Sequence, residues 1–338
     1  MPLLCLLLTL FTRLAFAEPM MWEVRPSEGG GKAYLFGSIH FGTSELYPLP
    51  EYVLAAFNDS EALVVELDMD QVSTAQASQI LIANGRLPKG ETLKSRLTQS
   101  QWDDLLEIAR YVGLPAPAFQ RLRPWMVAVQ LTAAKIRRSG FSEEYGVDKH
   151  MLELAKSQTP TKPVIELETF AQQMALFEGL DGPEEVAFLL QSMDEFHKTP
   201  ASLMAIIQAW KQGDEAVLEE LISGAFNQPP AGEPMPNQPL AQATAEAPSS
   251  GAAPKAYAAL DPVAQNRRAS TDDLYQRIFT DRNIMMQKQI AGRVREGERL
   301  FVVVGAGHIL GGDGLKTRLE QEGFRVRLQG SSESAGLK

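Results

Sequence analysis

Two histidines occupy the same local context near opposite ends of the chain. The segments YLFGSIH (34–40) and FVVVGAGH (301–308) each run from apolar residues to a glycine, and a histidine follows three positions later. An imidazole can bind a metal ion or transfer a proton near neutral pH. A glycine lets the backbone turn sharply where a strand ends, and open α/β sheets bind ligands at the carboxyl ends of their strands. If the two strands lie side by side, His40 and His308 meet in one site.

The chain has four histidines, and the other two have a different setting. His150 and His197 lie in charged, helical stretches, where we expect solvated surface side chains. For His40 and His308 the alternative to chemistry is structural, because two core imidazoles can simply bond to backbone carbonyls.

Acidic side chains near predicted strands could complete such a site. Glu66 lies within the apolar run ALVVEL (62–67), so we expect it on a buried strand, where an isolated charge is costly and needs a cation. That cation is a bound metal ion or, in a structural interpretation, Arg282. Glu168 follows the short strand predicted at 162–167, and its alternative role is a favourable charge at a helix N-terminus.

Three further polar residues accompany these candidates. Asp148 begins a predicted helix, where a first-turn carboxylate also has a simple electrostatic explanation. Arg282 and Asn283 interrupt the apolar pattern of the helix FTDRNIMM, and a guanidinium can clamp a carboxylate or an oxyanion. Imidazole with hard oxygen ligands suits zinc, manganese, cobalt or iron. Such an ion would lower the pKa of water, and a free glutamate would carry the proton.

Composition and motifs argue against several other functions. The 338 residues include 32 Lys and Arg against 42 Asp and Glu, a net charge of −10, and no long basic run, so nucleic-acid binding is not expected. No HExxH, GxSxG or P-loop pattern occurs. The single cysteine, Cys5, lies in a segment that we expect to be removed, so a mature chain would have neither disulfides nor a cysteine nucleophile.

The N-terminal segment 1–17 predicts a secretory signal peptide cleaved before Glu18. It combines the apolar stretch MPLLCLLLTLF with the small residues AFA at 15–17. The apolar run is shorter than the ~20 residues that span a bilayer, although an uncleaved anchor or a buried helix remains the alternative. No other segment is long and apolar enough to cross a membrane. We therefore expect a periplasmic or secreted protein of the bacterial envelope.

The remaining pattern predicts an α/β (α+β) protein. Apolar runs predict strands at 21–25, 32–39, 62–67, 162–167, 299–304 and 325–328. Helical periodicity dominates from about 71 to 225, and helices are predicted at 51–58, 122–136, 143–155, 186–193, 203–210, 270–295 and 315–322. Residues 226–256 are rich in Pro, Gly, Ala, Ser and Gln, and we expect a disordered insertion that acts as a spacer rather than a lid. Apart from this insertion, residues 18–338 are taken as one domain.

Five segments occur in an order typical of one protein family. They are LFGSIHFGTSELYPLP, ALVVELD, YGVDKHMLELAKSQTPTKPVIELETFAQQ, DRNIMM and FVVVGAGHILGGDGLKTRLEQEGFRV. With these residues the chain, over 20–225 and 270–328, resembles the TraB/PrgY/GumN family, which is related to the Tiki metalloproteases and more distantly to ChaN-like and erythromycin-esterase-like proteins. The resemblance implies a two-lobed fold, in which the N- and C-terminal strand–GxxH units form the sheet core beside a large helical middle region.

The resemblance also implies residue roles and a reaction. Tiki-like members are metal-dependent peptidases that favour manganese or cobalt; zinc is the alternative here. We accordingly expect metal ligands at His40, His308, Glu66 and Asp148, and catalytic residues at Glu66, Glu168, Arg282 and Asn283. The substrate would be a peptide or a small molecule. The alternative is a non-catalytic or regulatory envelope protein that binds a peptide or haem in the same cleft. The first motif departs from the usual GTxH, but the serine of GSIH keeps the hydroxyl.

Overall fold

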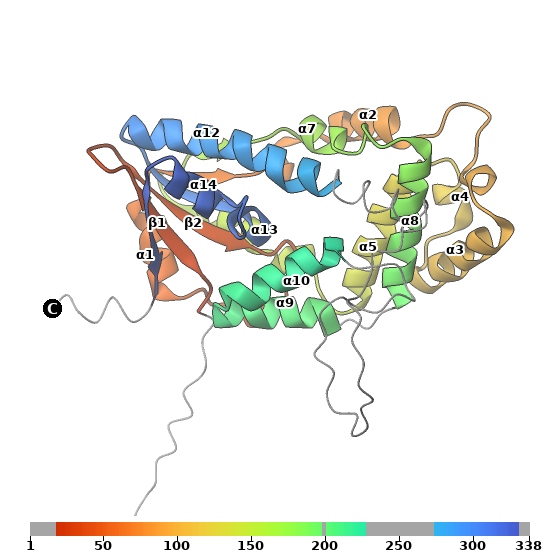
Figure 1. Ribbon diagram of the computed structural model, residues 1–338, viewed down its shortest axis with the longest axis horizontal. Coiled ribbons are helices and arrows are strands. Elements are labelled where there is room, and N and C mark those ends of the chain that lie inside the picture. The colour runs from red at the N-terminus through yellow and green to blue at the C-terminus, as the bar shows by residue number, and fades with distance from the viewer. Residues whose placement is uncertain (1–17, 198–200, 228–273, 331–338) are drawn as a thin grey trace, which may run out of the picture.

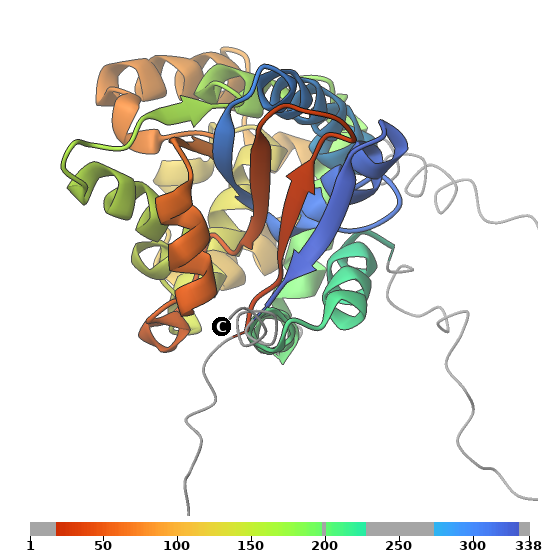
Figure 2. The same cartoon turned by 90° about the vertical axis from the view of Figure 1, so that its left-hand side faces the viewer.

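A six-stranded mixed sheet forms the centre of the computed structural model, which describes residues 18–197, 201–227 and 274–330. In the order β4-β3-β5-β2-β1-β6, the strands are Val164–Glu166 (β4), Ala62–Val65 (β3), Arg299–Gly305 (β5), Lys32–Ser38 (β2), Met21–Arg25 (β1) and Arg325–Gln329 (β6). Strands β4, β3, β5 and β2 run parallel, whereas β1 is antiparallel to both of its neighbours. Figure 2 shows the strands side by side in the middle of the molecule.

The two strands that carry the GxxH motifs are direct neighbours. β2 pairs in parallel with β5, with Leu35 opposite Val302 and Ser38 opposite Gly305. Both strands are apolar and almost entirely buried, as parallel strands covered by helices on both faces must be. The two motifs therefore end at the same edge of the sheet, as their spacing predicts.

Helices cover both faces of this sheet. On one face, Phe301 of β5 packs edge-to-face against Phe57 of α1 (Glu51–Asp59), and α6 (Val147–Ser157) lies beside α1. The opposite face is covered by α12 (Asp281–Arg295), α13 (Ala306–Ile309) and α14 (Leu315–Gln321). In Figure 1, α12 and α14 lie above β1 and β2, and α1 lies below them.

A second apolar core lies among the helices of the middle region. It is built by α3 (Gln99–Val112), α4 (Ala116–Phe119), α5 (Pro124–Arg138) and α8 (Gly182–His197), which lie on the right in Figure 1. Trp102 and Phe119 pack against each other in this core, and Leu189 of α8 is fully buried in it. The structure thus confirms the predicted α/β fold with a large helical middle region.

The remaining elements are short or lie around these two cores. They are the helices α2 (Thr74–Gly85), α7 (Phe170–Ala175), α9 (Ala201–Gln212) and α10 (Glu215–Asn227), and the 3-10 turns Ser44–Leu46, Met69–Gln71, Leu93–Arg96 and Glu143–Tyr145. The helix predicted from residue 143 begins later, at Val147, because a 3-10 turn and Gly146 precede it. The helix predicted over 270–295 is not uniform, since Gln276–Thr280 forms a π-helical turn, η5, before α12.

Two predictions fall largely on residues that the structure does not describe. The predicted signal peptide, 1–17, lies outside the described residues, and so does the predicted insertion 226–256 apart from its first two positions, which end α10. Within the described ranges, no helix combines the length and the apolar character that crossing a membrane requires.

The packing of Phe301 gives a test of the sheet core. This side chain is fully buried, and its ring contacts those of Tyr34, Phe36 and Phe57. Phe301→Ala leaves a cavity and is expected to lower the free energy of unfolding by about 3–5 kcal/mol, as measured by urea denaturation. Met285→Ala is the control: this side chain is 55% exposed, and its loss should change the free energy by less than about 0.5 kcal/mol. Equal effects would contradict the assigned core.

Candidate functional site

The two motif histidines lie close together at the carboxyl edge of the sheet. His40 follows β2 by two residues, and His308 lies in α13, which begins directly after β5. Gly305 ends β5 between them: a Cβ atom built on it would lie 3.4 Å from His40 Nε2 and 3.7 Å from His308 Cδ2. The same position is 3.4 Å from Glu66 Oε1. The absent side chain thus leaves a space that both imidazoles and one carboxylate border.

His308 is buried and held on both ring nitrogens. Its Nδ1–H donates to Asn283 Oδ1 at 2.7 Å, and the amide of Asn283 is fixed in turn because its Nδ2 donates to the carbonyl oxygen of Asp313 at 2.9 Å. Arg282 Nη1 donates to His308 Nε2 at 2.9 Å. Burial and the Arg282 charge lower the pKa of His308 to about 4, although Glu66 opposes this shift. The ring is therefore neutral at pH 7.

His40 has the opposite environment. More than half of its side chain is exposed, and its Nδ1–H donates to Asp148 Oδ1 at 2.9 Å. Desolvation acts to lower the pKa of His40, but the carboxylates of Asp148 and Glu66 outweigh it and raise the pKa to about 9. This ring is therefore protonated at pH 7 when no other cation binds it.

The start of α6 brings Asp148 to His40. The backbone N–H of Val147 donates to the carbonyl oxygen of Ile39 at 2.9 Å, so the helix begins directly beside the first motif. A Cβ atom on Gly146 would lie only 2.5 Å from the carbonyl oxygen of His40, and a glycine is therefore needed for this approach. As a result, the first-turn carboxylate predicted at Asp148 both begins a helix and holds the imidazole.

Glu66 lies directly after β3 and is nearly buried. Its Oε1 accepts the backbone N–H of Gly305 at 2.7 Å, and its Oε2 accepts from Arg282 Nη2 at 2.5 Å. Burial acts to raise the pKa of Glu66, but the neighbouring His308 and His40 rings, the Arg282 charge and the Gly305 hydrogen bond lower it to about 2. The carboxylate is therefore ionised, and it forms an ion pair with Arg282.

Arg282 lies at the centre of the group. Besides Glu66 and His308 it binds Glu168, to which Nε donates at 2.8 and 3.1 Å and Nη2 donates at 2.7 Å. Only 9–11% of each of the Arg282, Glu66 and Glu168 side chains is exposed. The π-helical turn η5 precedes Arg282 and supplies a further acceptor, the carbonyl oxygen of Ile278, at 3.1 Å from Nη1. π-helical turns are frequent at functional sites.

All residues predicted for the site thus lie in it, but not as a metal-binding group. Within the ranges that the structure describes, no three His, Cys, Asp or Glu side chains are arranged to hold a metal ion. Asp148 instead accepts from His40 Nδ1, and Arg282 donates to both His308 Nε2 and Glu66 Oε2. Asp148 therefore supports a ring rather than facing the shared space, and metal binding stays a prediction.

Sequence reasoning missed several contributors to the site. The backbone N–H of Gly305 and the carbonyl oxygen of Asp313 carry no signal in their side chains. Gln173, in α7, donates to Glu168 Oε2 at 3.4 Å and has no distinctive sequence context. The hydroxyl of Ser38 is buried at the end of β2 and finds no partner among the described residues. Ser38 was not missed, since the sequence already shows the hydroxyl of the GSIH motif, and this residue lies opposite Gly305 in the sheet.

The two other histidines do not join the site. His150, predicted as a solvated residue, is in fact half-buried because its ring packs on Tyr47, with the ring centroids 4.2 Å apart. Desolvation there lowers its pKa. His197 ends α8, and its side chain lies outside the described part of the chain.

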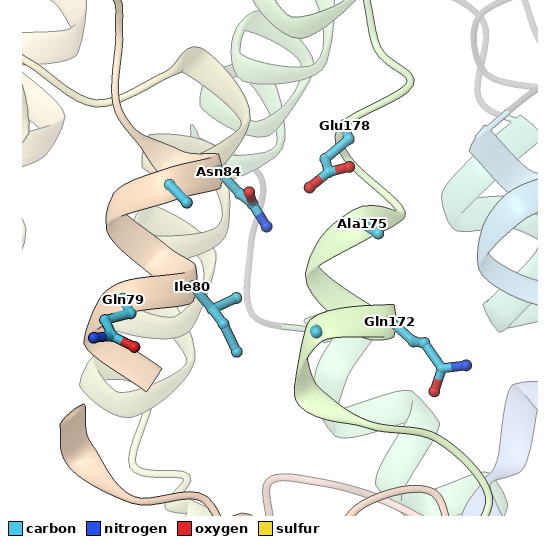
Figure 3. Close-up of a pocket in the computed structure, with 8 residues that line it drawn as sticks. Gln79, Ile80, Asn84, Gln172, Ala175 and Glu178 are labelled. Carbon is cyan, nitrogen blue, oxygen red and sulfur yellow. The ribbon is translucent and has the colours of Figure 1, made fainter. Parts of the chain in front are cut away.

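A groove between α2 and α7, drawn in Figure 3, lies apart from this site. Its volume is about 560 Å³, and it is lined by Gln79, Ile80, Ala83, Asn84, Ala171, Gln172, Ala175 and Glu178. Ile80, Asn84 and Glu178 point into it. Gln173 turns to Glu168 instead, so α7 stands between the groove and the site, and no residue predicted for the site lines the groove.

The His40–Asp148 pair makes a testable prediction about titration. Without the Asp148 carboxylate, desolvation is opposed only by Glu66, so Asp148→Asn should lower the pKa of His40 from about 9 toward 6.5. Nuclear magnetic resonance of the imidazole carbon-bound protons measures this change in metal-free protein. Because the folded-state pKa is raised, the pair stabilises the fold below pH 6.5, and this contribution disappears as the pH rises through about 9. Glu144→Gln, a nearby charge change without ring contact, should leave the titration unchanged; an unaltered His40 pKa in Asp148→Asn would refute the pairing.

Comparisons with known proteins identify the family of the chain. The model of the TraB/PrgY/gumN family matches residues 20–328. The chain is also 32% identical over 183 residues to the uncharacterized protein YbaP of Shigella flexneri and to that of Escherichia coli (strain K12). Each match covers 54% of this chain and 64% of the relative, so the chain spans less than two thirds of these relatives. No solved structure matches the chain. Since the family match extends over most of the sequence and includes both GxxH motifs, the chain belongs to the TraB/PrgY/gumN family.

Proposed function

We propose that this chain is a metal-dependent hydrolase. The observation that carries the proposal is the fixed orientation of two imidazoles. His40 and His308 each donate from Nδ1 to a supporting side chain, Asp148 or Asn283, and their opposite ring edges border one space beside Glu66. Histidines that bind metals typically place one ring nitrogen on an outer oxygen and the other on the ion. In this chain His308 Nε2 accepts from Arg282.

The chemistry of the donor set fits a divalent cation. Two imidazole nitrogens and the Glu66 carboxylate would hold manganese, cobalt or zinc. His308 is already neutral, with a pKa of about 4, and Glu66 is ionised, with a pKa of about 2, so both are in the state that a ligand needs. His40 would have to release the proton that Asp148 favours, which makes binding weaker at low pH.

The residues around this donor set would divide the remaining work. When bound, a divalent cation polarises a substrate carbonyl and acidifies water. The exposed His40 ring lies on the solvent side, where substrate approaches. Arg282 would stabilise a developing oxyanion only with N–H groups released from their present acceptors, which include His308 and Glu66. Both oxygens of Glu168 already accept from Arg282, so we assign Glu168 to positioning the guanidinium rather than to proton transfer.

We infer that the substrate is a peptide and that the protein acts in the bacterial envelope. The first inference is supported by the resemblance of both GxxH motifs to those of Tiki-like metallopeptidases. The second is supported by the apolar segment and the small residues AFA before Glu18.

Hydrolysis is tested with purified protein and a peptide library. Mn²⁺, Co²⁺ or Zn²⁺ is added separately, and mass spectrometry detects the products. Wild type should cleave with at least one ion, His40→Ala and His308→Ala should abolish cleavage, and Asn283→Ala should lower the rate ~10–100-fold because it removes only the ring support. His150→Ala is the matched control and should keep full activity. Equal cleavage by folded His40 and His308 variants would reject the proposal.

The proposed location has an independent test. Expressed in a bacterium, the full chain should appear in the periplasmic fraction with Glu18 as its first residue, as read by intact-mass measurement. Ala17→Arg removes the small residue that signal peptidase requires and should block processing. An intact mass that still includes the first 17 residues of the wild-type chain would contradict the signal-peptide prediction.

A further inference from the structure

Arg282 already uses the atoms that a metal ion would need. Its Nη1 donates to His308 Nε2 at 2.9 Å, and its Nη2 donates to Glu66 Oε2 at 2.5 Å. An imidazole nitrogen has a single lone pair in the ring plane, so His308 Nε2 cannot accept from a guanidinium and bind a cation together. Glu66 Oε1 is also engaged, by the backbone N–H of Gly305. The guanidinium and a divalent ion therefore exclude each other at His308 Nε2.

We propose that Arg282 is a built-in competitor of the metal ion: the ion binds after the guanidinium leaves His308 and Glu66, while Glu168 retains it. This inference rests on the proposed function, because it takes a metal site at these residues as given. It adds that Arg282 neutralises Glu66 when no metal ion is bound. The affinity for the metal ion then depends on how readily this guanidinium is displaced.

The contacts of Arg282 with other side chains divide into two groups that fit this exchange. Towards Glu168 it makes a two-pronged pairing, from Nε at 2.8 Å and from Nη2 at 2.7 Å, the geometry in which arginine binds carboxylates most strongly. Towards His308 and Glu66 it makes one hydrogen bond each. A rotation of the guanidinium around its pairing with Glu168 would break the hydrogen bonds to His308 and Glu66. The two hydrogen bonds to Glu168 would remain.

Charge favours the same exchange. Glu66 and Glu168 are both nearly buried, so the site needs positive charge whether or not an ion is bound. Without an ion, Arg282 supplies it to both carboxylates. A divalent ion beside Glu66 would repel the guanidinium and would take over the neutralisation of that carboxylate. Glu168 is then the partner that remains for Arg282.

Two variants separate competition from simple support of the site. Arg282→Met frees His308 Nε2 and Glu66 Oε2, so the affinity for Mn²⁺ should rise roughly tenfold or more. Glu168→Gln removes the retaining carboxylate and leaves Arg282 on Glu66, so the affinity should fall. If Arg282 merely held the ligands in place, its removal would weaken metal binding as well. Isothermal titration calorimetry of the purified protein with MnCl₂ measures these affinities, and His308→Ala shows how much binding needs the contested nitrogen.

A second measurement uses the unaltered protein and so does not depend on the variant folding. Zn²⁺ is added to ¹⁵N-labelled wild type, and the Nε–H resonance of Arg282 is followed. A shift of this resonance that saturates together with zinc binding supports the exchange. An unmoved resonance, or an Arg282→Met affinity equal to or below that of wild type, overturns it and leaves the proposed function intact. If neither Mn²⁺ nor Zn²⁺ binds to wild type or to Arg282→Met, the proposed function itself fails and this inference fails with it.

Discussion

The site depends on one guanidinium that serves three buried partners at once. Arg282 joins Glu66 after β3, Glu168 before α7 and His308 in α13, so a single side chain of α12 ties together elements from both halves of the chain. Two carboxylates this deeply buried are tolerated only with such compensation. Because the partners come from separate elements, the interaction also fixes α12 against the edge of the sheet.

The same short motif produces two imidazoles with opposite proton states. His308 is buried beside a guanidinium, and its pKa falls to about 4, whereas His40 is exposed beside a carboxylate, and its pKa rises to about 9. The difference comes from the partners and not from the motif, since both rings follow a parallel strand and a glycine. One ring is thus prepared to donate its lone pair, and the other still holds a proton near neutral pH.

The convergence of the histidines could be predicted because strand periodicity and the two glycines specify where each strand ends. The acidic and amide residues were indicated by their positions in apolar strands and helices, and the resemblance to a family assigned their roles. The structure brings all of them together. The partner on each Nδ1 could not be predicted, since Asp148 and Asn283 reach their rings from helices whose placement is a tertiary property. The π-helical turn before Arg282 could not be predicted either, because its residues show no hydrophobic periodicity that separates it from an α-helix. His150 was predicted to be solvated because the sequence does not show that Tyr47, which lies far earlier in the chain, packs on its ring.

The pairing of β2 with β5 also decides when the site comes into existence during synthesis. His40 leaves the ribosome early, but its neighbouring strand, Arg282 and His308 emerge only near the end of the described chain. Closing so long a loop is slow, and His308 cannot join Glu66 and Arg282 before the loop closes. Nascent chains and fragments cut before β5 therefore hold only one of the two motif imidazoles and no assembled centre. The site is therefore incomplete until β5 and His308 have been translated, close to the end of the described residues.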